Sequence, residues 1–131
     1  MAFTKDSGRQ NVKYAEALIG FADLTTGVAK AVVKLPLGAS VLSGDVVVDT
    51  AWDSATSAVM VVGDASTANR YFASASIKTA GRTALVPTGF VTTITQPNVE
   101  ATITVVGATT AGSLRVRVAY VAANRADENQ D

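Results

Sequence analysis

The sequence predicts an all-β fold of the sandwich or barrel type, and three observations point to it. Turn-forming residues recur about every eight to twelve positions, and short β-branched runs lie between them. No segment clearly has the pattern of a helix of ordinary length. The chain has 131 residues, the size of one domain, and no cysteine, so packing and backbone hydrogen bonds must hold the fold.

The first two expected strands lie in segments whose composition also suits a helix. Residues 14–22 contain good helix formers, but Gly20 interrupts them, and we interpret the stretch as a strand. Residues 28–35 contain the pair Val32-Val33 and end at Pro36, which also favours a strand. The nine strands expected lie at residues 12–22, 28–35, 40–50, 58–63, 70–77, 82–86, 90–95, 99–106 and 113–122.

The last two strands show the clearest alternation. In residues 113–122, four apolar side chains point to one face, while Arg115 and Arg117 point to the other. The apolar four are Leu114, Val116, Val118 and Tyr120. Residues 99–106 alternate in the same way, and residues 107–112 are long enough for a hairpin loop, so we expect these two strands to pair antiparallel.

Polar, oppositely charged segments flank the predicted domain. The expected organisation is an N-terminal arm at 1–11, one β-sandwich domain at 12–123 and an acidic C-terminal tail at 124–131. The first thirteen residues carry a net charge of plus two and the tail carries minus two, before its carboxylate. These segments are either solvated, flexible termini or segments that become ordered against a neighbouring subunit.

The composition excludes several classes of function. The chain has no histidine and no cysteine, which removes the usual general base, the commonest transition-metal ligands and thiolate nucleophiles. Lys+Arg and Asp+Glu are both 11, so no attraction to nucleic acid is expected. Only 17% of residues are charged while 48% are hydrophobic, which favours a surface partly covered by partners. No signal peptide and no membrane span are expected.

The acidic residues do not form a convincing catalytic or metal site. On a strand, Asp45 and Asp49 would share a face about 13 Å apart, too far for a glycosidase pair. We expect them to lie on a solvated strand face that leads into a turn started by an aspartate. Calcium binding through Asp53 and Asp64 is conceivable, but their spacing does not match an EF-hand loop. No enzyme activity, cofactor or metal is therefore expected.

Some residues are candidates for contact with other proteins. Arg70-Tyr71 places an arginine beside an aromatic ring, a pair enriched in interfaces, although Asp64 pairing with Arg70 is the structural alternative. Arg115 and Arg117 form either a phosphate-binding stripe or an intersubunit contact to carboxylates. Trp52 is interpreted as a core residue in preference to an interface anchor. The candidate interface residues are Lys5, Arg9, Arg70, Tyr71, Arg115 and Arg117.

A pattern of turns and strands over residues 28–122 resembles a known family. It consists of residues 35–39 (LPLGA), the run 46–48 followed by Thr50-Ala51, residues 54–57, and the Gly63-Asp64 turn followed by Asn69-Arg70-Tyr71. This pattern is similar to that of the capsid decoration, or cement, proteins of tailed bacteriophages. The resemblance carries no catalytic residues.

The resemblance implies both a fold and a location. It implies an antiparallel β-sandwich, jelly-roll-like, on the outer capsid surface, where it would stabilise contacts between copies of the major capsid protein. A homodimer or homotrimer is expected, with no nucleic acid or membrane partner. The alternative is a phage fibre or tail-associated module that recognises host carbohydrate through an exposed platform of Trp52, Tyr71 and Tyr120.

Overall fold

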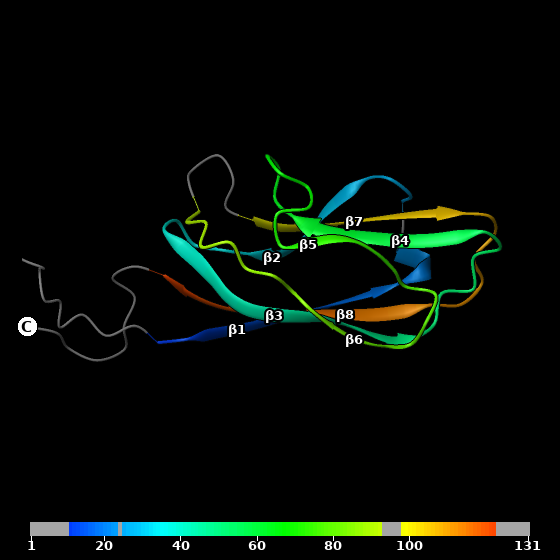
Figure 1. The fold of residues 1–131 in the computed structure, drawn as a ribbon, viewed down its shortest axis with the longest axis horizontal. Helices are drawn as coiled ribbons and strands as arrows, with labels where there is room; N and C mark the ends of the chain where they lie inside the picture. Colours follow the sequence, from blue (N-terminus) through cyan, green and yellow to red (C-terminus); the bar gives the residue numbers. More distant parts are fainter. Residues whose placement is uncertain (1–10, 24, 93–97, 123–131) are drawn as a thin grey trace, which may run out of the picture.

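The computed structural model describes residues 11–23, 25–92 and 98–122, which form two packed antiparallel sheets (Figure 1). Sheet A has the strand order β1-β8-β3-β6 and sheet B the order β2-β7-β4-β5. The strands are β1 (Lys13–Gly20), β2 (Ala29–Lys34), β3 (Ala39–Thr50), β4 (Ser57–Gly63), β5 (Phe72–Ser76), β6 (Gly81–Ala84), β7 (Asn98–Val106) and β8 (Ser113–Ala122). The predicted all-β sandwich is confirmed.

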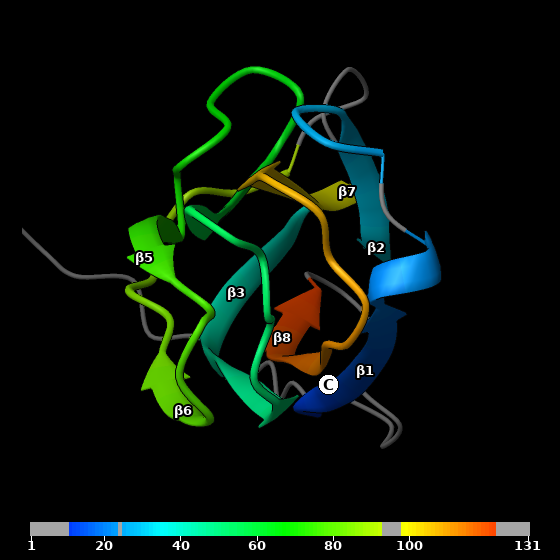
Figure 2. The same cartoon turned by 90° about the vertical axis from the view of Figure 1, so that its right-hand side faces the viewer.

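The connections make the sandwich a jelly roll. The chain alternates between the sheets from β1 to β4, forms the β4–β5 pair within sheet B, and then alternates again to β8. The end-on view in Figure 2 shows the strands surrounding one interior. This eight-stranded order, with two four-stranded sheets, is that of the double Greek key.

The core lies between the sheets and follows from the period of two. In β8, Leu114, Val116 and Val118 are fully buried, and they face Met60 of β4 and Ile103 of β7 across the sandwich. Burying each such side chain contributes about 1.5–3 kcal/mol relative to exposure. Trp52 is 1% exposed and joins the same core, so the core role predicted for it is confirmed.

The expected hairpin between the last two strands is wrong. β7 lies in sheet B beside β2 and β4, whereas β8 lies in sheet A between β1 and β3. Residues 107–112 therefore bridge the two sheets instead of closing one ladder. Gly112 has a φ of 154°, and a Cβ at this position would lie 2.6 Å from the Trp52 ring, so the bridging loop depends on glycine at this contact.

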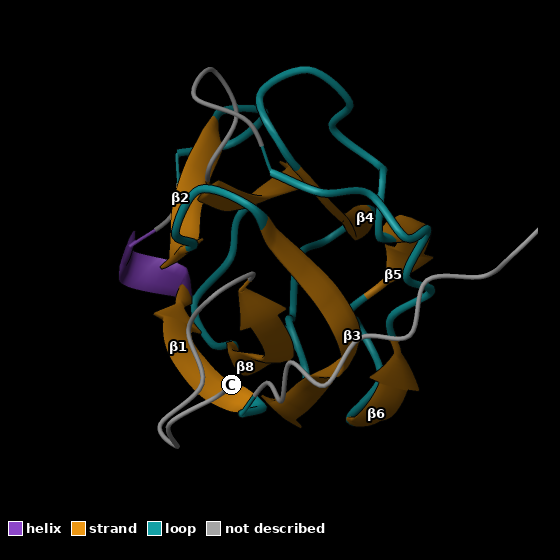
Figure 3. Ribbon diagram, turned by 90° about the vertical axis from the view of Figure 1, so that its left-hand side faces the viewer, coloured by secondary structure: helices purple, strands orange, loops and turns teal. Residues whose placement is uncertain are grey.

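Two other elements differ from the expected strands. The first strand ends at Gly20, and residues Phe21–Asp23 form a 3-10 turn, drawn in purple in Figure 3. Of the strand expected at 90–95, Val91 makes an isolated bridge to Ser40, and residues 93–95 lie outside the described part. Thr92 fixes this segment by donating its hydroxyl to the Pro36 carbonyl. No helix in the described ranges is long and apolar enough to cross a membrane.

Candidate interaction surface

The outer face of sheet A carries a row of ion pairs that crosses all four strands. Register places Glu16 beside Arg117, and Arg117 beside Asp45. Arg117 donates from Nε and Nη2 to the two Asp45 oxygens, at 2.7 and 2.6 Å. Arg82 on β6 donates from Nε to Asp45 Oδ2 at 2.5 Å. One carboxylate thus joins β8, β3 and β6.

Asp45 is buried although it lies on the outward row. Its side chain is 4% exposed, because the arginine side chains on either side cover it. Hydrogen bonding to Arg117 lowers the pKa of Asp45, an effect that desolvation opposes and Arg82 reinforces. The expectation of a solvated strand face is therefore wrong for Asp45, since two long side chains from neighbouring strands exclude water from it.

A second, more exposed ion pair lies beside the first. Arg115 donates from Nε and Nη2 to Asp49, at 2.9 and 3.1 Å, and its Nη1 lies 3.6 Å from Glu16. The bond to Asp49 raises the pKa of Arg115. The sequence identified both arginines but not their partners. Knowing that β3 is the neighbour of β8 would have identified the carboxylates.

Arg70 and Tyr71 lie together in the β4–β5 connection. Arg70 Nε bonds Asp64, and its guanidinium stacks 3.6 Å from the centroid of the Phe90 ring. Asp64 also accepts the backbone N–H groups of Ser66 and Thr67, so it caps its own loop. Tyr71 is 2% exposed, and burial raises its pKa. The structural alternative considered for Asp64 is thus what the structure shows.

The other candidate residues lie outside the described ranges or in the core. Lys5 and Arg9 lie outside the described residues. Trp52 and Tyr71 are both buried in the core, so these two rings do not form an exposed aromatic platform. Among the residues the structure describes, no group of three or more acidic side chains could hold a metal ion.

A loop clamp fixes the end of the sandwich near the 3-10 turn. Asp53 accepts the backbone N–H groups of Thr110 and Ala111, at 2.8 and 3.1 Å, and also the Thr110 hydroxyl. These bonds, the hydroxyl bond foremost, lower the pKa of Asp53. The carboxylate therefore holds residues 107–112 across the gap between the sheets.

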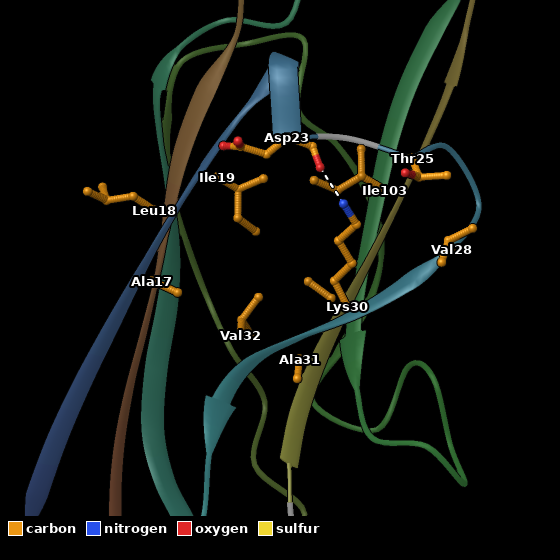
Figure 4. A pocket seen from close by; sticks show the side chains of 11 residues that line it. Ala17, Leu18, Ile19, Asp23, Thr25, Val28, Lys30, Ala31, Val32 and Ile103 are labelled. Carbon is orange, nitrogen blue, oxygen red and sulfur yellow. Dashed lines mark hydrogen bonds between the residues drawn. The ribbon is translucent and has the colours of Figure 1, made fainter.

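A pocket of about 220 Å³ opens between the edge strands β1 and β2 (Figure 4). Ile19, Val32 and Ile103 line its apolar wall, and Figure 4 shows the Leu18 side chain pointing away from it. Lys30 also lines the pocket and donates to the backbone carbonyl of Asp23. This pocket was not predictable from the sequence, because it arises where two edge strands of different sheets diverge.

Comparison with known proteins gives structural relatives from phage capsids. No family model and no curated protein gives a significant match. A chain in the structure of the Helicobacter pylori bacteriophage KHP30 capsid matches with a TM-score of 0.67 and 19% identity, covering 84% of this chain and 86% of that one. A chain of the Ralstonia phage GP4 capsid matches with a TM-score of 0.66 and 13% identity, covering 95% and 92%. These two show a shared fold.

A third relative is similar in sequence as well as in fold. A chain in the cyanophage Pam1 capsid asymmetric unit matches with a TM-score of 0.65 and 31% identity, covering 93% of this chain and 92% of that one. The likeness therefore extends over nearly the whole of both chains. On this evidence, the chain belongs to the same family as that protein of the cyanophage Pam1 capsid asymmetric unit, a family of phage capsid-associated proteins.

Proposed function

We propose that this chain is a virion structural protein that binds the outer surface of the mature capsid and stabilises contacts between major capsid proteins. The observation that carries the proposal is the 31% identity, over nine tenths of both chains, to a protein of a capsid asymmetric unit. The even charge balance and low charged fraction agree with a protein whose surface meets other proteins. This is a cement or decoration role, without catalysis.

The mechanism is thermodynamic. A protein that binds the assembled shell and not its free subunits adds its binding free energy to the stability of the shell. Because the shell carries many copies, even a few kcal/mol at each site oppose opening at many places together. A jelly roll held by the ion pairs of Asp45 and by the Asp53 clamp is a suitable rigid body for this, since little ordering free energy is lost on binding.

The proposed contacts include both described and terminal residues. Arg115 and Arg117 lie on the outer face of sheet A, with side chains 31% and 29% exposed, so each can still donate to a partner's carboxylate or carbonyl beside its intrachain bonds. Lys5 and Arg9 remain proposed attachment residues on the basis of the sequence. Arg70 is proposed in the same role only through the part of its guanidinium that Asp64 and Phe90 leave uncovered.

The test uses purified protein and two forms of the shell from the phage that encodes it. We expect the protein to co-sediment with mature, expanded capsids and not with unexpanded ones. We also expect capsids that carry it to release DNA at a higher temperature than particles lacking it. Absence of binding to expanded capsids, together with equal heat resistance of the two particle types, would refute the cement role.

A further inference from the structure

Strand β1 differs from the other three edge strands of the sandwich. Strand β6 has four residues, and the registers of β2 against β7 and of β5 against β4 are shifted; short or bulged strands commonly protect a sheet edge from further pairing. β1 has eight residues, and its register against β8 is unbroken from Lys13 to Gly20. Within the described part of the chain, no strand pairs with its other side. β1 is therefore the edge best suited to accept a further strand.

The backbone of β1 directs hydrogen-bonding groups towards this open edge. Phe21 N–H donates to the Gly112 carbonyl at 3.0 Å, whereas Gly20 N–H points the other way and donates to Asp23 Oδ2 at 3.0 Å. In an antiparallel pair, residues that bond the neighbouring strand alternate with residues whose N–H and C=O groups point away from it. Every second residue back from Gly20 therefore offers a donor and an acceptor to an incoming backbone. These residues are Tyr14, Glu16 and Leu18.

The pocket between β1 and β2 adjoins this edge. Its wall includes three alanines, one each from β1, β2 and β7, where larger side chains would close the gap between the sheets. They are Ala17, Ala31 and Ala101. Figure 4 shows Ile19 and Val32 pointing into the same space from the two strands. A cavity of about 150 Å³ holds benzene. The pocket of about 220 Å³ therefore has room for one large apolar side chain.

The charges around the pocket favour an acidic partner. Strands β1 and β2 together carry three lysines and one acid, namely Lys13, Lys30, Lys34 and Glu16. The Glu16 carboxylate lies on the outer face of sheet A, 3.6 Å from Arg115, and so does not neutralise the pocket. The Lys30 ammonium uses one of its three donors for the Asp23 carbonyl. A carboxylate entering beside an apolar side chain would therefore find a partner in Lys30.

We propose that the open edge of β1 and the adjoining pocket bind an extended segment of the major capsid protein. The segment adds a strand beside β1, inserts one apolar side chain between β1 and β2, and places an acidic side chain beside Lys30. Main-chain hydrogen bonds then supply affinity, and the pocket and the lysine select the sequence of the segment. This proposal rests on the proposed function, because it names how the capsid partner is held.

The test measures binding of the full chain to purified expanded capsids that lack it, by co-sedimentation over a range of concentrations. Ala17→Leu fills the pocket, and Leu18→Pro removes an N–H from the open edge without removing a bond to β8. We expect each variant to raise the dissociation constant at least about tenfold. One matched control is Ala75→Leu, which enlarges a partly buried alanine on β5, at the opposite side of the sandwich. The other is Leu18→Ala, which keeps the N–H and shortens a side chain that points away from the pocket. Both controls should bind as the wild type does.

Hydrogen exchange provides a second readout of the same edge. The amides of Tyr14, Glu16 and Leu18 should exchange quickly in the free chain and at least about tenfold more slowly on the capsid, because each would bond the added strand. Thermal unfolding of each variant checks that the fold is kept. If Leu18→Pro fails to fold, Ala17→Leu and the exchange rates still decide the outcome.

The results that would overturn the proposal are distinct from those that would overturn the cement role. Wild-type binding that neither variant weakens, with unchanged exchange in β1, would refute this mode of docking and leave the cement role standing. Absence of wild-type binding would refute both. Slow exchange in the free chain that is lost on deleting residues 2–10 would assign the edge to the chain's own N-terminal arm. Exchange that slows as the concentration of free chain rises would assign it to a second copy. Either assignment would refute docking of a capsid segment.

Discussion

Replacing Asp45 with asparagine tests whether the ion pairs of sheet A stabilise the fold. The substitution keeps the shape of the side chain but removes the charge that accepts from Arg117 and Arg82, at 2.5 to 2.7 Å. Because this carboxylate joins β8, β3 and the short edge strand β6, its loss should destabilise the whole of sheet A. We expect Asp45→Asn to lower the free energy of unfolding.

The size of the loss in unfolding free energy follows from how exposed the two arginine partners of Asp45 are. Breaking a fully buried ion pair costs about 3–5 kcal/mol, because an unpaired charge is left in the interior. Here the Arg82 and Arg117 side chains are 60% and 29% exposed, so water can solvate both once Asp45 is neutral. The expected loss is therefore about 1–2 kcal/mol, as for charge-assisted hydrogen bonds that are replaced by hydration.

The assay is urea unfolding at pH 7, followed by far-UV circular dichroism. With an m-value of about 1–3 kcal/mol/M, a loss of this size moves the urea midpoint down by roughly 0.3–2 M. The matched control is Asp49→Asn, whose side chain is 41% exposed and whose midpoint should barely move. Equal shifts in the two variants, or none in Asp45→Asn, would show that burial of the carboxylate does not matter.

The lowered pKa of Asp45 predicts how the stability of the fold depends on pH. Because the folded-state pKa of Asp45 is below the ordinary 3.8, the folded state binds this proton less readily than the unfolded state. Its contribution to stability is therefore complete above about pH 5 and is lost as the pH falls through 3.8 and below. The wild-type urea midpoint should thus fall towards that of Asp45→Asn between about pH 5 and pH 3. A gap that stays constant over this range would contradict the assignment.

The other predictions concern packing, a loop and attachment. Gly112→Ala should destabilise the fold by about 1–3 kcal/mol, because the added Cβ meets the Trp52 ring, and red-shifted tryptophan emission would report the displaced ring. Asp53→Ala should speed hydrogen exchange at the Thr110 amide without lowering protection in the core strands; unchanged exchange would show that the clamp is dispensable. Deleting residues 2–10 should lower capsid occupancy at physiological salt, and full occupancy would mean that these residues do not contribute to attachment.

The sequence was sufficient for the class of fold but not for the order of strands. Alternation in residues 113–122 correctly identified which side chains of β8 face inwards, because that pattern depends only on local geometry. The position of β8 between β1 and β3 depends on contacts between distant segments. Residues 107–112 have a composition that suits a hairpin equally well, so the bridge between the sheets was not apparent from their sequence.

The dependence on contacts between distant segments also explains why the ion pairs on the outer face of sheet A were not predicted. Arg115 and Arg117 were identified from their strand alone, but Asp45 and Asp49 became their partners only through the register of β3 against β8. The expectation of solvated acids failed for Asp45, since covering it requires Arg82 from a third strand.

The pairing of β1 with β8 also affects how the chain folds during its synthesis. In the described structure β1 hydrogen-bonds to β8, with Lys13 opposite Tyr120, so these partners are separated by nearly the whole domain. During synthesis, β1 leaves the ribosome long before β8 exists, and its edge must stay unpaired until β8 has been synthesised. Such non-local pairing makes folding slow. A product cut short before Ser113 would lack a central strand of sheet A, leaving both β1 and β3 with exposed edges prone to aggregation.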